Sequence, residues 1–334
     1  MSTPFDILSE EETELLSDEG LPEWIDPMLA TLVDDPFSDP DWIYERKLDG
    51  ERCIAYCDGD EVRLMSRNER EITANYPELA DALVSQSLHM QCVFDGEVVA
   101  FDGDVTSFQK LQPRMQVSTV QQARQSDVAV FLYLFDILHL DGSNLRDLPL
   151  RPRKEILRRT IELEDPLRFT SHRNENGEEL YEDACASGWE GLIAKDATSG
   201  YEGKRSRDWL KFKCVGQQEF VVGGFTDPEG SRSEFGALLI GYNAGDSFVY
   251  AGMVGTGFDE GTLDRLGSQL RASEIDDSPF SAGKPPESAH WVDPEMVVEV
   301  GFTEWTDAGR LRHPRYLGLR RDKPAEDVVR ETAS

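Results

Sequence analysis

The sequence has little positive charge, few cysteines and no long apolar run. Its 334 residues contain 34 Lys and Arg against 65 Asp and Glu, which gives a net charge of −31. No segment stays apolar over the length needed to cross a bilayer, and the first residues lack the basic-then-apolar order of a signal peptide. We therefore expect a cytoplasmic protein with no membrane-spanning part.

The cysteines are too few and too scattered for a disulfide framework or a recognisable metal motif. There are five, an odd number, and no CxxC pair stands at a matching distance from histidines. Cys53 and Cys57 share one apolar strand-like run, where a common metal ion is a minor alternative. We interpret all five as buried thiols, namely Cys53, Cys57, Cys92, Cys185 and Cys214.

The acidic excess is spread along the chain and is typical of a salt-adapted surface, which stays soluble when charges are strongly screened. It argues against nucleic acid binding unless the few cations are concentrated, because a polyanion is held by local positive charge. They are concentrated in two groups. In isolation, each group would more often be a solvated surface than a phosphate site. The groups are Lys204, Arg205, Arg207, Lys211 and Lys213, and Arg310, Arg312, Arg315, Arg320, Arg321 and Lys323.

The hydrophobic pattern predicts two domains that meet near residue 215. Residues 1–20 are acidic with little apolar content, so we expect a loose arm or a short helix there. The region 21–215 reads as a mixture of strands and helices, and the Gln-rich stretch 104–127 has a low-complexity flavour. The predicted elements are a hairpin within 41–65, strands at 93–101, 128–139, 191–195 and 209–215, and helices at 76–85 and 151–163.

Residues 216–334 change to short strands punctuated by glycine, with one helix. This pattern suits a small closed β-barrel of the OB kind, although a small sandwich would read similarly. The predicted strands are 220–225, 237–242, 248–254 and 296–302, and the helix is 259–270.

One lysine stands at a strand end just before a glycine turn, in the segment Lys47-Leu48-Asp49-Gly50. Alone this motif is weak, because four residues recur by chance and a solvated turn is the commoner interpretation. An ordered series of further motifs changes that balance. They are Arg52, Ser66-Arg67-Asn68, Asp95-Gly96-Glu97, Phe135-Asp136, Glu190 to Lys195, Trp209 to Lys213, Glu304-Trp305-Thr306, His313-Pro314 and Arg320 to Lys323.

In these motifs the chain resembles the nucleotidyltransferase superfamily of ATP-dependent DNA ligases and mRNA capping enzymes, and most closely the ligase module of bacterial end-joining ligases. The resemblance covers nearly the whole chain. It implies an α+β fold, with an antiparallel-sheet nucleotidyltransferase domain of the ATP-grasp-like kind followed by an OB-fold β-barrel domain. It also implies a DNA ligase that uses ATP as a substrate.

By this resemblance, Lys47 attacks the α-phosphorus of ATP and carries AMP, which then passes to the 5'-phosphate of a nick before the 3'-hydroxyl displaces it. A lysine amine has an ordinary pKa of about 10.4, so a nucleophilic lysine needs a cationic or desolvated setting that favours the free amine. Lys211, Lys213 and a metal ion are candidates to provide that setting.

The resemblance also assigns the nucleotide contacts. Arg52 and Arg67 suit ribose and phosphate because a guanidinium binds phosphate through two hydrogen bonds. Phe135 would stack on adenine, and Glu45 would help to seat the base, partly through its backbone. The full set of expected nucleotide contacts is Glu45, Arg52, Arg67, Glu97, Phe135, Lys195, Arg205, Lys211, Lys213, Arg320 and Lys323, the last two reaching pyrophosphate only if the second domain closes over the cleft.

Glu97 and Glu190 are expected to bind Mg²⁺ or Mn²⁺, since carboxylate oxygens are the ligands these cations prefer. Glu97 would in addition lie near the ribose. The expected partner is nicked or broken duplex DNA, with a Ku-like end-binding protein as a further hypothesis and a monomer as the expected state. The alternatives are a GTP-dependent capping-type guanylyltransferase or an RNA ligase, and a non-catalytic OB-fold nucleic-acid-binding protein.

Overall fold

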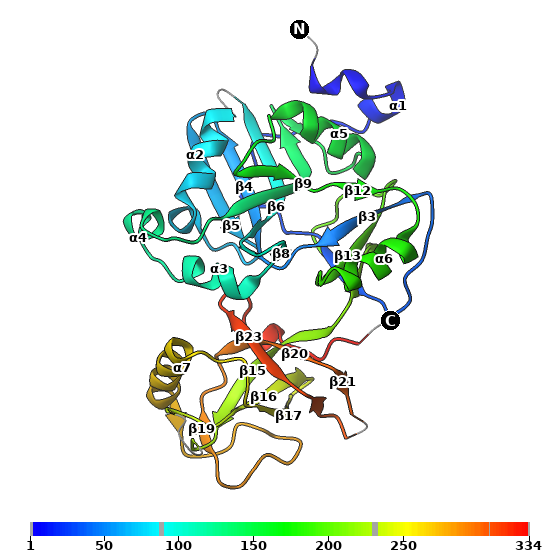
Figure 1. Cartoon of the computed structure of the whole chain (residues 1–334). Helices are drawn as coiled ribbons and strands as arrows, with labels where there is room; N and C mark the ends of the chain where they lie inside the picture. The colour runs from blue at the N-terminus through cyan, green and yellow to red at the C-terminus, as the bar shows by residue number, and fades with distance from the viewer. Residues whose placement is uncertain (1–2, 87–89, 229–232, 307, 333–334) are drawn as a thin grey trace. The chain divides into compact units, whose positions relative to one another are not determined.

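The computed structural model describes residues 3–86, 90–228, 233–306 and 308–332. The chain divides into two compact units, the first ending at Cys214 and the second spanning Val215–Thr332. In Figure 1 the first unit runs from blue to green and the second from yellow-green to red. Both are α+β with mainly antiparallel sheets, as the sequence predicted. Within the described ranges no helix is both long and apolar enough to cross a membrane.

The larger sheet of the first unit is built on three long neighbouring antiparallel strands, β4, β6 and β9 (Figure 1). Short strands extend it at both edges, and only β11 runs parallel to its neighbour. The predicted hairpin is β4 with β5, joined at the turn after Asp58. The strands are β1 (Ser17–Asp18), β4 (Glu51–Asp58), β5 (Glu61–Ser66), β6 (Gln91–Val99), β9 (Phe131–Leu140), β10 (Ser143–Asn144) and β11 (Leu167–Phe169).

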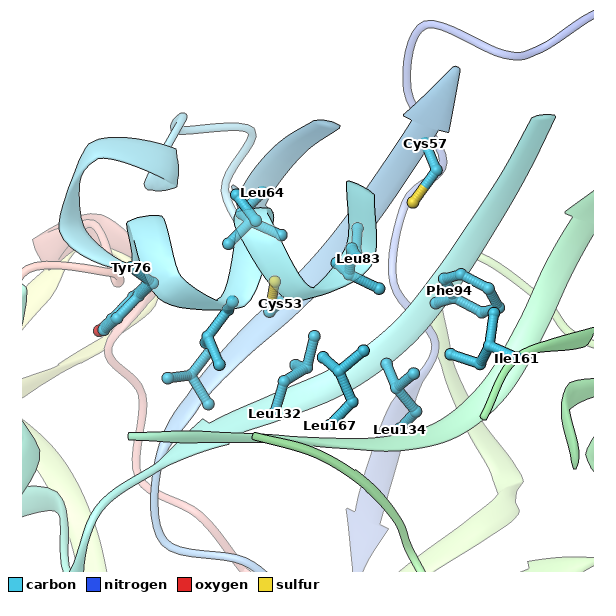
Figure 2. Close-up of a cluster of buried hydrophobic side chains, with 14 of the residues drawn as sticks. Cys53, Cys57, Leu64, Tyr76, Leu83, Phe94, Leu132, Leu134, Ile161 and Leu167 are labelled. Atoms are coloured by element: carbon cyan, nitrogen blue, oxygen red, sulfur yellow. The ribbon is translucent and has the colours of Figure 1, made fainter. Parts of the chain in front are cut away.

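One face of this sheet forms the main hydrophobic core. Alternate residues of a strand point to one side, so Cys53, Ala55 and Cys57 all enter it from β4. Figure 2 shows these thiols in one cluster with leucines of β9 and β11. Helices cover this face, each side chain that is fully buried contributing about 1.5–3 kcal/mol. They are α2 (Pro77–Gln86), α3 (Phe108–Met115) and α5 (Leu150–Thr160).

The segments that looked least regular are folded onto this core. The N-terminal arm forms a 3-10 turn at Pro4–Ile7 and the short helix α1 (Glu10–Thr13), and then joins the sheet through β1. Phe5 and Ile7 pack against the main core. The Gln-rich stretch contains α3 and α4 (Val120–Arg124), because Phe108 and Leu111 supply apolar anchors that its average composition hides.

A second sheet of five strands completes the first unit. Its order is β12-β3-β13-β14-β2, with β14 and β2 parallel and the other pairs antiparallel. The strand carrying Lys47 is therefore not part of the predicted hairpin, although it precedes it directly. The elements are β2 (Leu29–Leu32), β3 (Trp42–Lys47), β12 (His172–Arg173), β13 (Gly191–Asp196), β14 (Arg205–Lys213) and, beside them, α6 (Gly177–Ala186) and the hairpin β7 (Phe101–Asp102) with β8 (Val105–Thr106).

The second unit is centred on β15, which pairs with β16, β19 and β20. Asp259 caps helix α7, its side chain accepting a hydrogen bond from the backbone N–H of Thr262 at 2.7 Å. No pairing among the described strands closes the sheet into a barrel. The elements are β15 (Gly216–Phe225), β16 (Leu238–Ala244), β17 (Ser247–Val254), α7 (Glu260–Ala272), β18 (Glu274–Ile275), β19 (His290–Val292), β20 (Val297–Phe302), β21 (Glu304–Trp305), β22 (Leu311–Arg312) and β23 (Arg315–Arg320).

The prediction of five buried thiols is wrong for two of them. Cys185 and Cys214 form a disulfide, with Cα atoms 5.2 Å apart. The last turn of α6 lies beside the end of β14, a tertiary neighbourhood that a separation of 29 residues conceals. Cys53, Cys57 and Cys92 are buried thiols as expected. Burial raises the pKa of Cys53 well above the ordinary value, which keeps it a thiol and disfavours the shared metal.

Replacing Cys185 with serine is expected to lower the free energy of unfolding of the first unit. The disulfide closes a loop of 29 residues, and the restriction it places on the unfolded chain corresponds to about 3 kcal/mol. Urea denaturation with and without a dithiol reductant measures this. The reductant should shift the midpoint of the wild-type protein and leave the variant unchanged, and equal shifts in both would contradict the prediction.

Candidate active site

One face of the five-stranded sheet carries five of the predicted site residues, namely Glu45, Lys47, Lys195, Lys211 and Lys213. Gly191 lies opposite both Lys47 and Lys213, and Ile193 lies opposite both Glu45 and Lys211. Opposed residues of paired strands point to the same face. The shared face therefore presents Glu45, Lys47, Lys195, Trp209, Lys211 and Lys213, while the other packs Tyr44, Leu192 and Phe212 into a hydrophobic core.

The larger sheet contributes a second set of side chains to the same site. The guanidinium of Arg52 on β4 lies 4.8 Å from the ring centre of Phe135 and 5.6 Å from that of Trp209. The Lys195 ammonium lies 4.1 Å and 4.0 Å from the same two rings. Glu97 lies opposite Arg52 and so points to the same side of its sheet. The two sheets thus bring together Arg52 and Trp209, which are far apart in the sequence.

Lys47 is held by Glu190. Its Nζ lies 2.5 Å from Oε1 of Glu190, and its side chain is 20% exposed. Burial alone would lower the pKa of the amine, but Glu190, with Asp49 and Glu97, raises it above the ordinary lysine range. The expected setting that favours a free amine is therefore not found in this arrangement, because a carboxylate rather than a cation lies nearest to Nζ.

The turn after Lys47 is held by contacts of Asp49 and Gly50 with later segments of the chain. The backbone N–H of Phe108 donates to Oδ2 of Asp49 at 2.9 Å, and the N–H of Asp49 donates to Oγ1 of Thr106 at 3.1 Å. A Cβ on Gly50 would lie 2.2 Å from the carbonyl oxygen of Val98. Aspartate and glycine are thus required here by a hydrogen bond and by a close backbone approach.

A second glycine positions Glu190. Gly191 has a φ of +154°, and a Cβ there would lie 1.8 Å from the carbonyl oxygen of Phe212. Strand β13 can begin directly after Glu190 only because Gly191 has no side chain. The second carboxylate oxygen of Glu190, Oε2, is buried and has no hydrogen-bond partner among the described residues. A buried carboxylate oxygen without a donor is costly unless a cation or donor joins it.

Arg52 is fixed by an acid that the sequence did not assign to the site. Asp95, fully buried, accepts from Nε of Arg52 at 2.5 Å and from Nη2 at 2.6 Å. The hydroxyl of Tyr201 also donates to Asp95, at 2.7 Å. Burial opposes the charge on Arg52, but Asp95 raises the pKa of the guanidinium, so it stays charged. Asp95 belongs to the motif Asp95-Gly96-Glu97, and its place in that motif could have identified it as a site residue.

A buried cluster of three charges lies against the rings of Phe135 and Trp209. Glu45 is 2% exposed, with Oε2 2.7 Å from the Lys195 ammonium and Oε1 bonded to Lys154. Burial favours the neutral acid, but Lys154 and Lys195 lower the pKa of Glu45. Burial and the charge of Lys154 lower the pKa of Lys195 to about 8, against the opposing effect of Glu45 and Asp136.

The sequence prediction missed Lys154, which comes from α5. A signal was available in the helical spacing. Leu150, Arg153, Lys154 and Leu157 occupy positions i, i+3, i+4 and i+7 of one helix face, and all are buried. Two cations on the apolar face of a helix indicate buried acidic partners.

The lowered pKa of Lys195 predicts that the stability of the protein depends on pH. Its folded-state pKa of about 8 lies below the ordinary value of 10.5, so the unfolded chain binds this proton more tightly. The protein therefore carries a destabilising contribution below about pH 8 that is relieved as the pH rises from about 8 to about 10.5. Urea unfolding across this window should show the wild type gaining stability relative to Lys195→Met. Parallel curves for the two proteins would contradict the prediction.

The remaining predicted residues belong to other segments of the chain. Arg205 begins β14 and donates to the carbonyl of Ala30 at 2.5 Å, and Arg67 follows β5. Arg320 and Lys323 belong to the second unit, where Arg320 pairs with Glu299 at 3.0 Å and with Asp322, and Lys323 pairs with Glu219 at 3.2 Å. Their roles in binding nucleotide stay predictions.

The two units correspond to two known sequence families. Residues 27–213 match the family model described as ATP dependent DNA ligase domain, and residues 231–323 match that of the ATP dependent DNA ligase C terminal region. The chain therefore belongs to the family of ATP-dependent DNA ligases. This confirms the resemblance seen in the ordered motifs and supports neither the GTP-dependent nor the non-catalytic alternative.

Within that family the chain is closely related to the ligase modules of LigD proteins. It is 38% identical over 321 residues to the multifunctional non-homologous end joining protein LigD of Pseudomonas aeruginosa, covering 93% of this chain and 37% of that protein. It is 34% identical to a DNA ligase of Natronomonas pharaonis, covering 85% and 52%. The chain thus spans between about two fifths and about half of these curated relatives.

A solved structure agrees with the sequence relatives. The structure described as mycobacterial DNA ligase D complexed with ATP and MES superposes with a TM-score of 0.67 at 34% identity. The match covers 92% of this chain and 98% of that one. Both the first unit and the second unit of this chain therefore have counterparts in that ligase structure.

Proposed function

We propose that this chain seals breaks in duplex DNA through a covalent AMP carried on Lys47. The observation that supports it is the position of the Lys47 amine, at the end of β3 on the face shared with Lys211 and Lys213 and beside Glu190. Positive charge on the same sheet face as a nucleophilic amine is suited to an attack on a phosphate anion. Family membership supplies ATP as the nucleotide.

The proposed reaction has three transfers. Nζ of Lys47 bonds to the α-phosphorus of ATP as the bond to pyrophosphate breaks. The 5'-phosphate of the nick then takes AMP from Lys47, and the neighbouring 3'-hydroxyl displaces AMP to form the phosphodiester. Positioning and charge neutralisation carry most of the catalysis in such transfers.

Divalent cation binding is part of the proposal. Glu190 offers a buried carboxylate oxygen without a hydrogen bond, and Glu97 contributes to the negative potential at Lys47. Among the described residues no group of three or more His, Cys, Asp or Glu forms a complete protein cage. A two-carboxylate site suits Mg²⁺ or Mn²⁺, which keep waters and substrate phosphates as ligands. A cation there would weaken the hold of Glu190 on Lys47 and so favour the free amine.

The nucleotide contacts proposed from the motifs fit the side chains that the two sheets bring together. Phe135 is 7% exposed and lies edge-on to Trp209, with ring centres 6.0 Å apart, so its ring is held in place for stacking on a base. Arg52 is fixed by Asp95 on the same side. The other proposed contacts are Glu45, Arg67, Glu97, Lys195, Arg205, Lys211 and Lys213, with Arg320 and Lys323 from the second unit.

The partner is proposed from the relatives. Proteins named for non-homologous end joining support duplex DNA ends or nicks as the substrate. We propose in addition that a Ku-like end-binding protein presents the DNA to a cytoplasmic monomer. Added end-binding protein should raise the rate of end joining, and an unchanged rate would remove this part of the proposal.

The function is tested with labelled ATP or GTP and Mg²⁺, followed by denaturing separation and addition of nicked DNA. We expect an AMP adduct that nicked DNA discharges with formation of a sealed strand. The assay is run at low and high KCl, because a net charge of −31 destabilises the compact state when screening is weak. A GMP adduct, or an AMP adduct that only RNA discharges, would replace the proposal with capping or RNA ligation.

A further inference from the structure

We propose that Lys154 is a positioning residue for the nucleotide base, acting through Glu45 and the backbone of Phe135. The inference rests on the proposed function, because it assigns Phe135 and Glu45 to the base. Lys154 comes from helix α5, outside both sheets, and no sequence motif of the site includes it.

The contacts of Lys154 tie three segments together. Its Nζ donates to Oε1 of Glu45 on β3, to the carbonyl of Phe135 on β9 at 3.2 Å, and to the carbonyl of Thr170 after β11 at 3.3 Å. An ammonium has three donors, and here each has its own acceptor. The side chain is 3% exposed, so the two sheets are joined at this point by a fully satisfied buried cation.

The charge balance of the cluster indicates more than a structural ion pair. Glu45 receives Lys154 on one carboxylate oxygen and Lys195 on the other. One lysine would neutralise the buried acid, and a second buried cation adds a desolvation cost. The contribution of Lys154, the second lysine, is to fix the orientation of Glu45. It prevents Glu45 from rotating, and it thereby fixes the height of the Lys195 ammonium above the rings of Phe135 and Trp209.

Removal of Lys154 should consequently disturb nucleotide binding more than the fold. In Lys154→Met, Glu45 still has Lys195 as an ion-pair partner, so no buried acid is left without a cation. The carbonyl of Phe135 loses its donor and Glu45 is free to turn toward Lys195. A tenfold rise in the KM for ATP corresponds to about 1.4 kcal/mol of lost nucleotide binding.

The experiment compares two reactions of the full chain. The first is formation of the AMP adduct at varied ATP, and the second is sealing of a nick that already carries AMP on its 5'-phosphate, which needs no free nucleotide. We expect Lys154→Met to raise the KM for ATP about tenfold and to leave sealing of the pre-adenylated nick close to wild type. Lys110→Met is the matched control, since Lys110 is 55% exposed and pairs only with a surface acid, Asp102.

Each other outcome overturns the inference. An unchanged KM for ATP in Lys154→Met would show that the residue does not position the base. Parallel loss of both reactions would show a structural role. Should Lys154→Met fail to fold, Lys154→Gln, which is one atom shorter but keeps a nitrogen with two N–H donors, must give the same split between the two reactions with a smaller rise in KM. Absence of an AMP adduct in the wild-type protein would instead refute the proposed function itself.

Discussion

Lys47→Ala is expected to abolish formation of the AMP adduct. The amine is the only proposed nucleophile, and none of its neighbours on the sheet face can replace it, since Lys211 and Lys213 lie on another strand. Lys47→Arg should be equally inactive, because a guanidinium stays protonated in proteins. Incubation with labelled ATP followed by denaturing separation measures the adduct directly.

The Lys47 variants should keep the fold. Removing the amine leaves the buried Glu190 without its ion pair, but the Lys47 side chain is 20% exposed, so water can enter the space that the amine vacates. Sealing of a pre-adenylated nick should therefore survive in Lys47→Ala, because that step uses AMP already on the DNA. Retention of the AMP adduct in either variant would refute the assignment of Lys47.

The largest expected effect on stability comes from Asp136. Its two carboxylate oxygens each accept from Arg153 at 2.9 Å, and both side chains are 0% exposed. Asp136→Ala would leave a buried guanidinium without its acid, which costs about 3–5 kcal/mol. Chemical denaturation at neutral pH measures the loss.

Two further variants separate this effect from a general loss of charge. Asp81 pairs with Arg124 on the surface, where both side chains are more than half exposed, so Asp81→Ala should change stability little. The double variant Arg153→Met, Asp136→Leu replaces both charges with apolar groups and should recover most of the lost stability. A double variant as unstable as Asp136→Ala would mean that the shape of the pair, and not its charge, is what matters.

The sequence predicted the longest strands and three of the helices because their signals are local. The apolar runs at 93–101 and 128–139 became β6 and β9, and the helices at 76–85 and 259–270 became α2 and α7 with shifts of one or two residues. Alternation and helical spacing are read within one element and do not depend on distant neighbours. Strand β23 was not predicted, because a basic stretch of residues masks its alternating buried positions.

The site was predicted in part, for a physical reason that can be seen at single residues. Lys47, Glu97 and Glu190 stand in motifs that contain glycine, and Gly50 and Gly191 are required there by a close backbone approach. Lys154 leaves no such trace, because its role comes from acceptors on three other segments. Residue type and spacing reveal a backbone constraint more readily than a long-range hydrogen bond.

The sequence by itself determined the family, the two-part α+β organisation and the lysine on which the chemistry is proposed to rest. Only the tertiary structure decided that Glu190 holds Lys47, that Lys154 and Lys195 share Glu45, and that Cys185 is bonded to Cys214. Each of these joins residues from different elements. Such pairs depend on which strands become neighbours and on their register, and these are set by packing of the whole domain rather than by any local run of residues.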